Sequence, residues 1–164
     1  MTKAQAFLQE LNQEAVATRQ ILLAVPFDKA DWKPHDKSMT LGRLATHVAE
    51  IPSWFGITLL QDVLDFAAGD YKPFVAKDTA DLIALLDKNL KNAEEVLNTF
   101  PDDKMPDNWT MRAGETVFFS LPKEQVVRTW CLNHWYHHRA QLGVYLRLLN
   151  VPLPGTYGPS ADAT

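Results

Sequence analysis

Four long segments of the chain repeat apolar residues at helical spacing, and this pattern limits the possible folds more than any other feature of the sequence. Residues three and four apart share one face of an α-helix, so such a repeat predicts a helix with one buried side. The segments cover residues 2–25, 39–69, 79–100 and 122–150. We therefore expect an all-α protein, a four-helix bundle with long connecting loops, built as a single domain over residues 1–164.

Proline and capping residues mark the helix boundaries. Pro26 ends the first segment. Either Ser38 or Thr40 is the candidate N-cap of the second helix, and either Asp78 or Thr79 that of the third.

Pro52 interrupts the second segment, although the apolar stripe continues on both sides of it. Proline lacks a backbone N–H and clashes with the carbonyl four residues earlier, that of Val48, so we expect the helix to kink or restart here. A loop over residues 70–77 should follow. The stripe consists of Leu41, Leu44, Ala45, Val48, Ile51, Phe55, Leu59, Val63 and Phe66.

Two stretches lack helical periodicity. Within residues 101–121, Val117–Leu121 has the composition of a strand, so a short extended or hairpin segment is an alternative to a plain loop before the last helix. Pro122 suits the first position of that helix. The tail, Val151–Thr164, is rich in proline and glycine and should be irregular, with Tyr157 either pinning it to the bundle or belonging to a frayed end.

Composition excludes several classes of protein. The net charge is −4 and the basic residues are scattered, which argues against a nucleic-acid partner. The chain has no run of about 18 apolar residues and no apolar signal core, so we expect no membrane span or membrane partner. A single cysteine requires no oxidising compartment. We expect a cytoplasmic protein.

The last segment carries the strongest chemical signal, because three of the five histidines lie within five residues. His134 and His138 are four apart, so one turn of helix can direct both imidazoles at one metal ion. His137 competes for this role. The row through His134 and His138 is mostly apolar and the row through His137 is polar, so we take the first two as the inward pair. A partly buried polar seam is the alternative reading.

Other candidates for site chemistry are isolated in the sequence. His47 lies at the edge of the second stripe, where a lone histidine is usually structural, but facing helices of a bundle can bring it to the pair on the last helix. His35 lies in a loop and is expected at the surface. Cys131 is a candidate fourth ligand or nucleophile, and we favour a buried structural thiol.

Several stretches together resemble the DinB/YfiT-like family of four-helix-bundle metalloproteins. The resemblance implies a divalent metal held by one histidine from the second helix and two from the last, which match His47, His134 and His138 and give His137 no coordinating duty. The matching stretches are WKPHDKSMTL at Trp32–Leu41, TLGRLATHVAEIPSW at Thr40–Trp54, NHWYHHRAQLGVYLR at Asn133–Arg147 and PGTYGPSAD at Pro154–Asp162.

Such a ligand set suits a catalytic ion. Three neutral imidazoles leave a coordination position open, and an ion so held lowers the pKa of a bound water from about 15.7 toward about 7. Nitrogen ligands favour zinc, nickel, copper or iron over magnesium or calcium, and zinc and nickel are the first candidates. The second ring nitrogens need partners, for which Glu50, Asn133 and Gln141 are candidates, although we expect Gln141 to be solvated.

The resemblance also suggests an activity. Relatives include bacillithiol transferases and a mycothiol-dependent isomerase, which implies that the metal activates water or a low-molecular-weight thiol toward a small substrate. We expect a metal-dependent hydrolase or thiol transferase. Zincin chemistry is excluded, because Trp135 stands where that motif needs glutamate. The alternatives are a non-enzymatic metal-binding stress protein or sensor, and a bundle that is mainly a homodimer with a structural metal.

Overall fold

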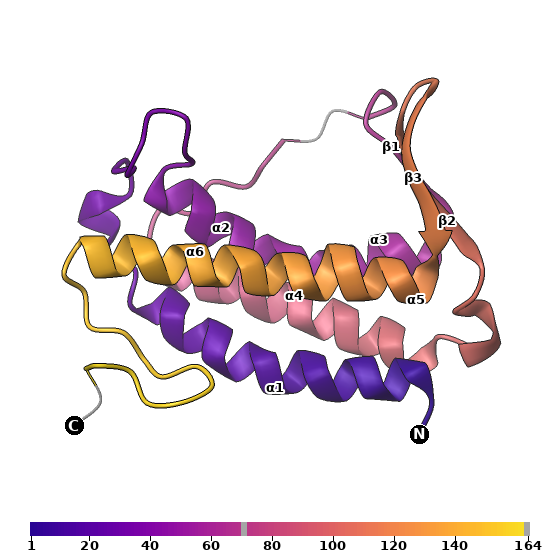
Figure 1. Cartoon of the computed structure of the whole chain (residues 1–164), viewed down its shortest axis with the longest axis horizontal. Helices are drawn as coiled ribbons and strands as arrows, with labels where there is room; N and C mark the ends of the chain where they lie inside the picture. The colour runs from indigo at the N-terminus through magenta and orange to yellow at the C-terminus, as the bar shows by residue number, and fades with distance from the viewer. Residues whose placement is uncertain (70–71, 163–164) are drawn as a thin grey trace.

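The computed structural model describes residues 1–69 and 72–162, so parts of the expected loop and of the tail, residues 70–71 and 163–164, lie outside it. Four helical rods form the predicted bundle, and the second and fourth are each interrupted (Figure 1). A π-helical turn, Val127–Asn133, divides the fourth rod. The α-helices are α1 (Lys3–Leu23), α2 (Leu41–Glu50), α3 (Trp54–Leu60), α4 (Thr79–Thr99), α5 (Lys123–Val126) and α6 (His134–Leu148).

Side chains cap the starts of three helices. The Oγ1 atom of Thr40 accepts a hydrogen bond from an N–H in the first turn of α2 at 3.3 Å, and the carboxylate of Asp78 does the same for α4 at 2.8 Å, which decides between the two candidates at each start. At the start of α1, Thr2 and Gln5 each accept a hydrogen bond from the backbone N–H of the other. These bonds satisfy N–H groups that the first turn of a helix leaves without partners.

The second rod restarts at Pro52, as predicted, and a short 3-10 turn separates α2 from α3. Proline has no N–H to give to the carbonyl of Val48, and the indole Nε1 of Trp135 donates to that oxygen at 2.9 Å instead. The next carbonyl, that of Ala49, accepts from the side-chain amide of Asn89 at 2.9 Å. The break therefore ties α2 to both α4 and α6.

The all-α prediction is incomplete, because a three-stranded sheet stands at one end of the bundle (Figure 1). β2 lies in the middle, parallel to β1 and antiparallel to β3. The extended segment predicted at Val117–Leu121 belongs to the β2–β3 hairpin, which turns at Gly114 with a φ of 58° that favours a residue without Cβ. The strands are β1 (Val63–Asp65), β2 (Asn108–Ala113) and β3 (Thr116–Pro122).

The prediction that the second helix continues through Val63 and Phe66 is wrong, because α3 ends before both. Lys123 accounts for the position of this end. Its side chain is buried, and its Nζ donates to the carbonyls of Thr58 and Leu59 at 3.0 and 3.2 Å. A cation at the end of a helix satisfies carbonyls that the last turn leaves unpaired.

The apolar stripes of the bundle meet in one core, and a smaller cluster packs the sheet onto its end. Trp135 is fully buried in the main core and Trp109 in the smaller cluster. None of the helices in residues 1–69 and 72–162 has the length and apolarity needed to cross a membrane. Other fully buried side chains of the main core are Leu11, Leu22, Leu41, Leu44, Ile51, Phe55, Leu82, Leu86 and Leu97.

The tail after α6 turns back along the bundle toward α1 (Figure 1). The hydroxyl of Tyr157 donates to the carboxylate of Glu14 at 2.8 Å and accepts from the guanidinium of Arg139 at 2.6 Å. Tyr157 therefore pins the tail to the bundle, which decides between the two readings of this residue.

Candidate metal centre

Three histidine side chains from two helices meet beside the core. His47 comes from α2, and His134 and His138 come from the beginning of α6. The Nε2 atoms of His47 and His134 lie 3.3 Å apart, and one ring nitrogen of each histidine lies within 4.8 Å of those of the other two. We call these residues the three-histidine site. They are the residues singled out in the sequence, and the structure brings all three together.

Two stacked tryptophans lie beside the site, Trp130 from the π-helical turn before α6 and Trp54 from α3. A π turn holds more residues than an α turn and often occurs near functional residues. Trp130, in this turn, stacks on Trp54 with ring centroids 4.3 Å apart and planes at 13°. The ring of His134 packs edge-on against Trp54 at 4.9 Å. The two indoles therefore form a flat wall next to the three-histidine site.

The Nδ1 atom of His47 faces the carboxylate of Glu50. It is buried, lies 3.6 Å from Oε2 of Glu50, and has no hydrogen-bond partner among the described residues. Glu50 accepts hydrogen bonds from Nη1 of Arg43 at 2.9 Å and from the N–H of Phe74 at 3.2 Å. This carboxylate is placed to orient the ring with Nε2 toward the site, the role that carboxylates commonly play behind metal-binding histidines.

Gln141 supports the ring of His138. Nδ1 of His138 lies 2.8 Å from Oε1 of Gln141, so this nitrogen can donate and Nε2 is left for the site. The expectation that Gln141 is solvated is wrong, because residues three apart on a helix are neighbours. Asn133 is exposed, and His137 is exposed on the flank of the pair, as expected.

Burial keeps two of the rings neutral. Burial, followed by the neighbouring histidines, lowers the pKa of His134 to about 4. Burial also lowers the pKa of His138 to about 4, against the hydrogen bond to Gln141, and the positive charge of Arg43 contributes to the lowering. A neutral imidazole presents the lone pair that a metal ion needs. At neutral pH these rings can therefore bind a metal without first losing a proton.

The donor set fits a divalent transition metal. Zinc–nitrogen bonds of about 2.0–2.1 Å in a tetrahedron hold ligand nitrogens about 3.3–3.4 Å apart. The Nε2 atoms of His47 and His134 lie at this separation. Imidazole ligands suit zinc, copper, iron and nickel, whereas magnesium and calcium prefer oxygen. The three-histidine site can therefore hold the kind of ion that the sequence predicts, with all three ligands from the protein being nitrogens.

The three-histidine site opens onto a cavity of about 390 Å³. α2, α3, the π-helical turn and the sheet all contribute to its wall, which is mostly apolar. Structural zinc sites usually close around the ion with four protein ligands, whereas catalytic sites keep a position for water or substrate. The cavity beside the three histidines leaves room for such a molecule. Its other lining residues are Arg43, Trp54, Ile57, Leu64, Phe66, Met111 and Trp130.

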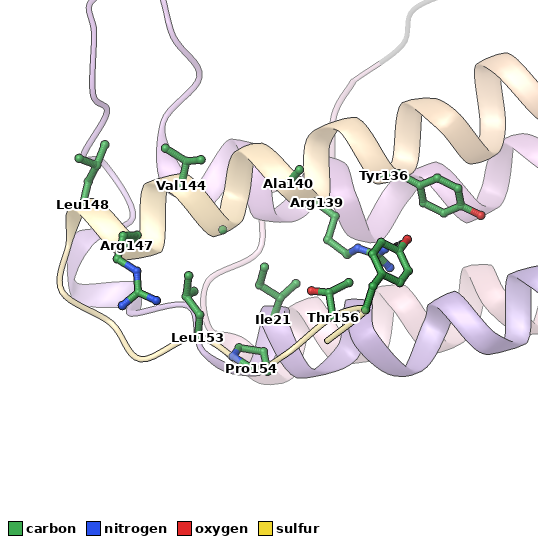
Figure 2. A pocket seen from close by; sticks show the side chains of 12 residues that line it. Ile21, Tyr136, Arg139, Ala140, Val144, Arg147, Leu148, Leu153, Pro154 and Thr156 are labelled. Atoms are coloured by element: carbon green, nitrogen blue, oxygen red, sulfur yellow. Dashed lines mark hydrogen bonds between the residues drawn. The ribbon is translucent and has the colours of Figure 1, made fainter. Parts of the chain in front are cut away.

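A larger cavity, of about 630 Å³, lies on the other side of α6, beneath the tail (Figure 2). Its lining is mainly aliphatic and includes Ile21, Val144 and Leu153. Its two arginines are both paired, Arg139 within the bundle and Arg147 with the carboxylate of Asp162 at 2.7 Å. The described lining holds no histidine, cysteine or carboxylate, and the hydroxyls of its two tyrosines, Tyr136 and Tyr157, donate to glutamates of α1.

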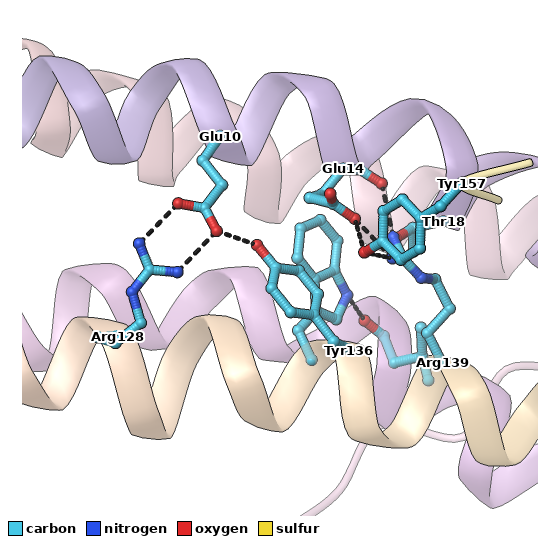
Figure 3. Close-up of polar contacts among 9 residues, drawn as sticks. Glu10, Glu14, Thr18, Arg128, Tyr136, Arg139 and Tyr157 are labelled. Atoms are coloured by element: carbon cyan, nitrogen blue, oxygen red, sulfur yellow. Dashed lines mark hydrogen bonds and ion pairs between the residues drawn. The ribbon is translucent and has the colours of Figure 1, made fainter.

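Two clusters of the same composition, each a glutamate, an arginine and a tyrosine, join α1 to the fourth rod (Figure 3). We call them the Glu10 cluster (Glu10, Arg128, Tyr136) and the Glu14 cluster (Glu14, Arg139, Tyr157). Two N–H···O bonds of 2.7 Å link Arg128 to Glu10, and the hydroxyl of Tyr136 donates to the same carboxylate at 2.7 Å. Burial raises the pKa of Tyr136, so this hydroxyl stays protonated.

Cys131 and His35 take no part in the three-histidine site. Cys131 is fully buried, and its Sγ lies 3.5 Å from Oγ1 of Thr58. Burial raises the pKa of the thiol to about 12, which favours the structural reading made from the sequence. His35 is exposed in its loop and accepts a hydrogen bond from the N–H of Lys37 at 3.1 Å, as expected.

The fold and the site define a helical bundle with three histidines that can hold a metal ion. The model of the DinB family matches residues 1–163, and the chain belongs to this family. A search of curated proteins finds no match.

Solved structures share the fold. A DinB-like protein from Bacillus cereus ATCC 10987 is 23% identical with a TM-score of 0.70, and the match covers 93% of this chain and 97% of that one. A DinB-like protein from Bacillus subtilis is 13% identical with a TM-score of 0.67, over 93% and 99%. A candidate member of the DinB family from Exiguobacterium sibiricum is 19% identical with a TM-score of 0.62, over 100% and 99%.

Proposed function

We propose that the protein is a metal-dependent enzyme of the hydrolase or thiol-transferase type that acts on a small molecule. The three-histidine site would hold a divalent ion, with zinc or nickel as the first candidates. One observation carries the proposal, namely that three ring nitrogens converge at the end of a cavity large enough for a small substrate.

The bound ion would lower the pKa of a water or a thiol and so supply hydroxide or thiolate at neutral pH. The residues of the chain have separate tasks around it. Gln141 would fix the ring of His138 through its hydrogen bond, and the carboxylate of Glu50 would attract the Nδ1–H of His47 from 3.6 Å. Trp54 exposes an apolar face that excludes bulk water from the cavity.

The competing proposal is a metal-binding bundle without turnover, such as a sensor or stress protein. It predicts an ion whose coordination is complete without substrate. The cavity weighs against it, because a purely structural site has no use for an apolar opening beside the ligands.

Metal content tests the proposal. Protein made without a histidine tag is analysed by elemental analysis as wild type, as His47→Ala, His134→Ala and His138→Ala, and as the matched control His137→Ala. We expect near-stoichiometric metal in the wild type and the control and loss in the other three. Loaded wild type is then assayed with ester substrates and with thiol–electrophile pairs. Absence of metal after incubation with zinc or nickel at neutral pH would rule the proposal out.

A further inference from the structure

The cavity beside the three-histidine site has an uneven distribution of charge. Among its described lining residues, Arg43 is the cation and none is a carboxylate. Glu50, which pairs with Arg43, does not line the cavity. Neutral imidazoles would also leave the charge of a bound divalent ion uncompensated. The polar end of the cavity therefore favours a negatively charged guest.

Arg43 is fixed in place at this end. It precedes His47 by four residues on α2, so both side chains lie on the same face of the helix. The ion pair with Glu50, at 2.9 Å, restrains the guanidinium, whose side chain is 29% exposed. A planar guanidinium held by a carboxylate is well suited to recognise carboxylate, sulfonate or phosphate groups.

The rest of the described lining of the cavity is apolar, and part of it is flat. The stacked rings of Trp54 and Trp130 form one wall. Phe66 and Leu64 come from the neighbourhood of β1, and Met111 comes from β2. Aromatic walls of this kind bind planar apolar groups by burial and stacking. The guanidinium of Arg43 and the apolar wall therefore line the same cavity.

We propose that this cavity binds a small organic anion, with a flat apolar body against Trp54 and Trp130 and the anionic group toward Arg43. The inference rests on the proposed function, because it names the substrate class of the same site. It assigns Arg43 to substrate recognition and leaves the three histidines to the metal.

Isothermal titration calorimetry with two matched probes tests the inference. Naphthalene-2-sulfonate carries the negative charge, and methyl 2-naphthyl sulfone has the same body without it. Both are titrated into metal-free and zinc-loaded protein. We expect the sulfonate to bind about tenfold more tightly than the sulfone, as is typical for a hydrogen bond to a charged group. Failure of the sulfonate to bind wild type, or equal affinities for the two probes, would overturn the inference.

Variants separate charge from shape. In metal-free protein, Arg43→Met should reduce the ratio of the sulfone and sulfonate dissociation constants from about ten to about one. Arg43→Lys should keep part of this preference because the charge remains. Phe66→Ala should weaken both probes alike. Arg147→Met is the matched control, since Arg147 is also paired with a carboxylate but lines the other cavity. A preference that survives in Arg43→Met, or disappears in Arg147→Met, would overturn the inference.

The outcome is independent of the test of the proposed function. Elemental analysis decides whether the three-histidine site holds metal. The sulfonate preference of the metal-free protein decides whether Arg43 selects anions. A protein without metal that still prefers the sulfonate would support the anion site and refute the enzyme.

Discussion

The two sides of α6 differ in how the buried polar groups are bonded. On the side facing α1, Arg139 is 3% exposed and its guanidinium bonds to the carboxylate of Glu14, the hydroxyl of Thr18 and the hydroxyl of Tyr157. On the side facing α2, the ring nitrogens of the three-histidine site point at one another. The Nε2 atoms of two of them lie 3.3 Å apart, and the described residues place no carboxylate between them.

The difference distinguishes two parts of one helix: the side facing α1 has the features of a scaffold, and the side facing α2 has those of a binding site. A buried polar group left without a partner costs about 1–3 kcal/mol, so a structural network is complete within the protein. The Glu14 cluster meets this condition. Of the converging neutral imidazoles, His47 and His134 can share one N–H···N hydrogen bond, and a positively charged ion would bind all three rings at once. The contrast predicts that the two sides respond differently to mutation.

The largest effect is expected from Arg139→Met. This change leaves the carboxylate of Glu14 buried without its guanidinium, and breaking a buried ion pair in this way costs about 3–5 kcal/mol. Urea unfolding followed by circular dichroism measures the loss. The metal content should be unchanged, because Arg139 faces away from the three-histidine site. The double variant with Glu14→Gln should recover part of the stability, and a single variant as stable as wild type would break the comparison.

A smaller effect is expected from His138→Leu, and only when metal is present. Zinc at 100 times its dissociation constant should stabilise wild type by about 2.7 kcal/mol, because the ion binds the folded state. The variant should show almost none of this stabilisation in thermal unfolding. With a chelator present, the variant should be at least as stable as wild type, since leucine buries apolar surface in place of an imidazole. A full zinc shift in the variant would contradict the assignment.

Gln141→Ala should act on metal affinity alone. Loss of a hydrogen-bond partner behind a metal-binding histidine typically costs about 10–100-fold in affinity. Competition with a chromophoric chelator measures it. Asn133→Ala is the control, because Asn133 is exposed on the same rod and should leave the affinity unchanged. Equal affinities for the two variants would show that the bond at 2.8 Å does not orient His138.

The last prediction concerns pH in the metal-free protein. The pKa of His134 is about 4 in the folded chain, against 6.5 ordinarily, so the unfolded chain binds the extra proton between these values. The contribution of this residue to the free energy of unfolding is therefore full above pH 6.5 and is lost as the pH falls toward 4. His134→Gln should flatten this part of the profile, measured as urea midpoints in the presence of a chelator. An unchanged slope would show that the ring is not held neutral.

Features of the fold that depend on near neighbours in the chain were predictable. The apolar stripes, the N-caps at Thr40 and Asp78 and the break at Pro52 all depend on residues within a few positions. The sheet and the end of α3 could not be predicted in this way. β1 pairs Val63 with Thr110, far along the chain, so its residues look like a continued helical stripe.

The same limit applies to the site. His134 and His138 share one helix, so spacing alone indicates the pair. His47 lies 87 residues before His134, so the expected bundle only allowed the three to meet, and the family resemblance named His47 as a ligand. The proposed role of Arg43 also could not be predicted from the sequence. It depends on the ion pair with Glu50 and on the side chains that the folded bundle places around the cavity.

The break at Pro52 has a consequence for the order of events during synthesis of the chain. Two carbonyls of α2 remain hydrated until the side chains of Asn89 and Trp135 reach them from α4 and α6. Trp135 directly follows His134, so the residue that satisfies the first of these carbonyls leaves the ribosome together with the second metal ligand. When only the first half of the chain has left the ribosome, His47 is the one histidine of the three-histidine site that is present, and the two carbonyls of α2 still lack their partners. A metal ion at the three-histidine site would therefore be bound late, when the bundle closes.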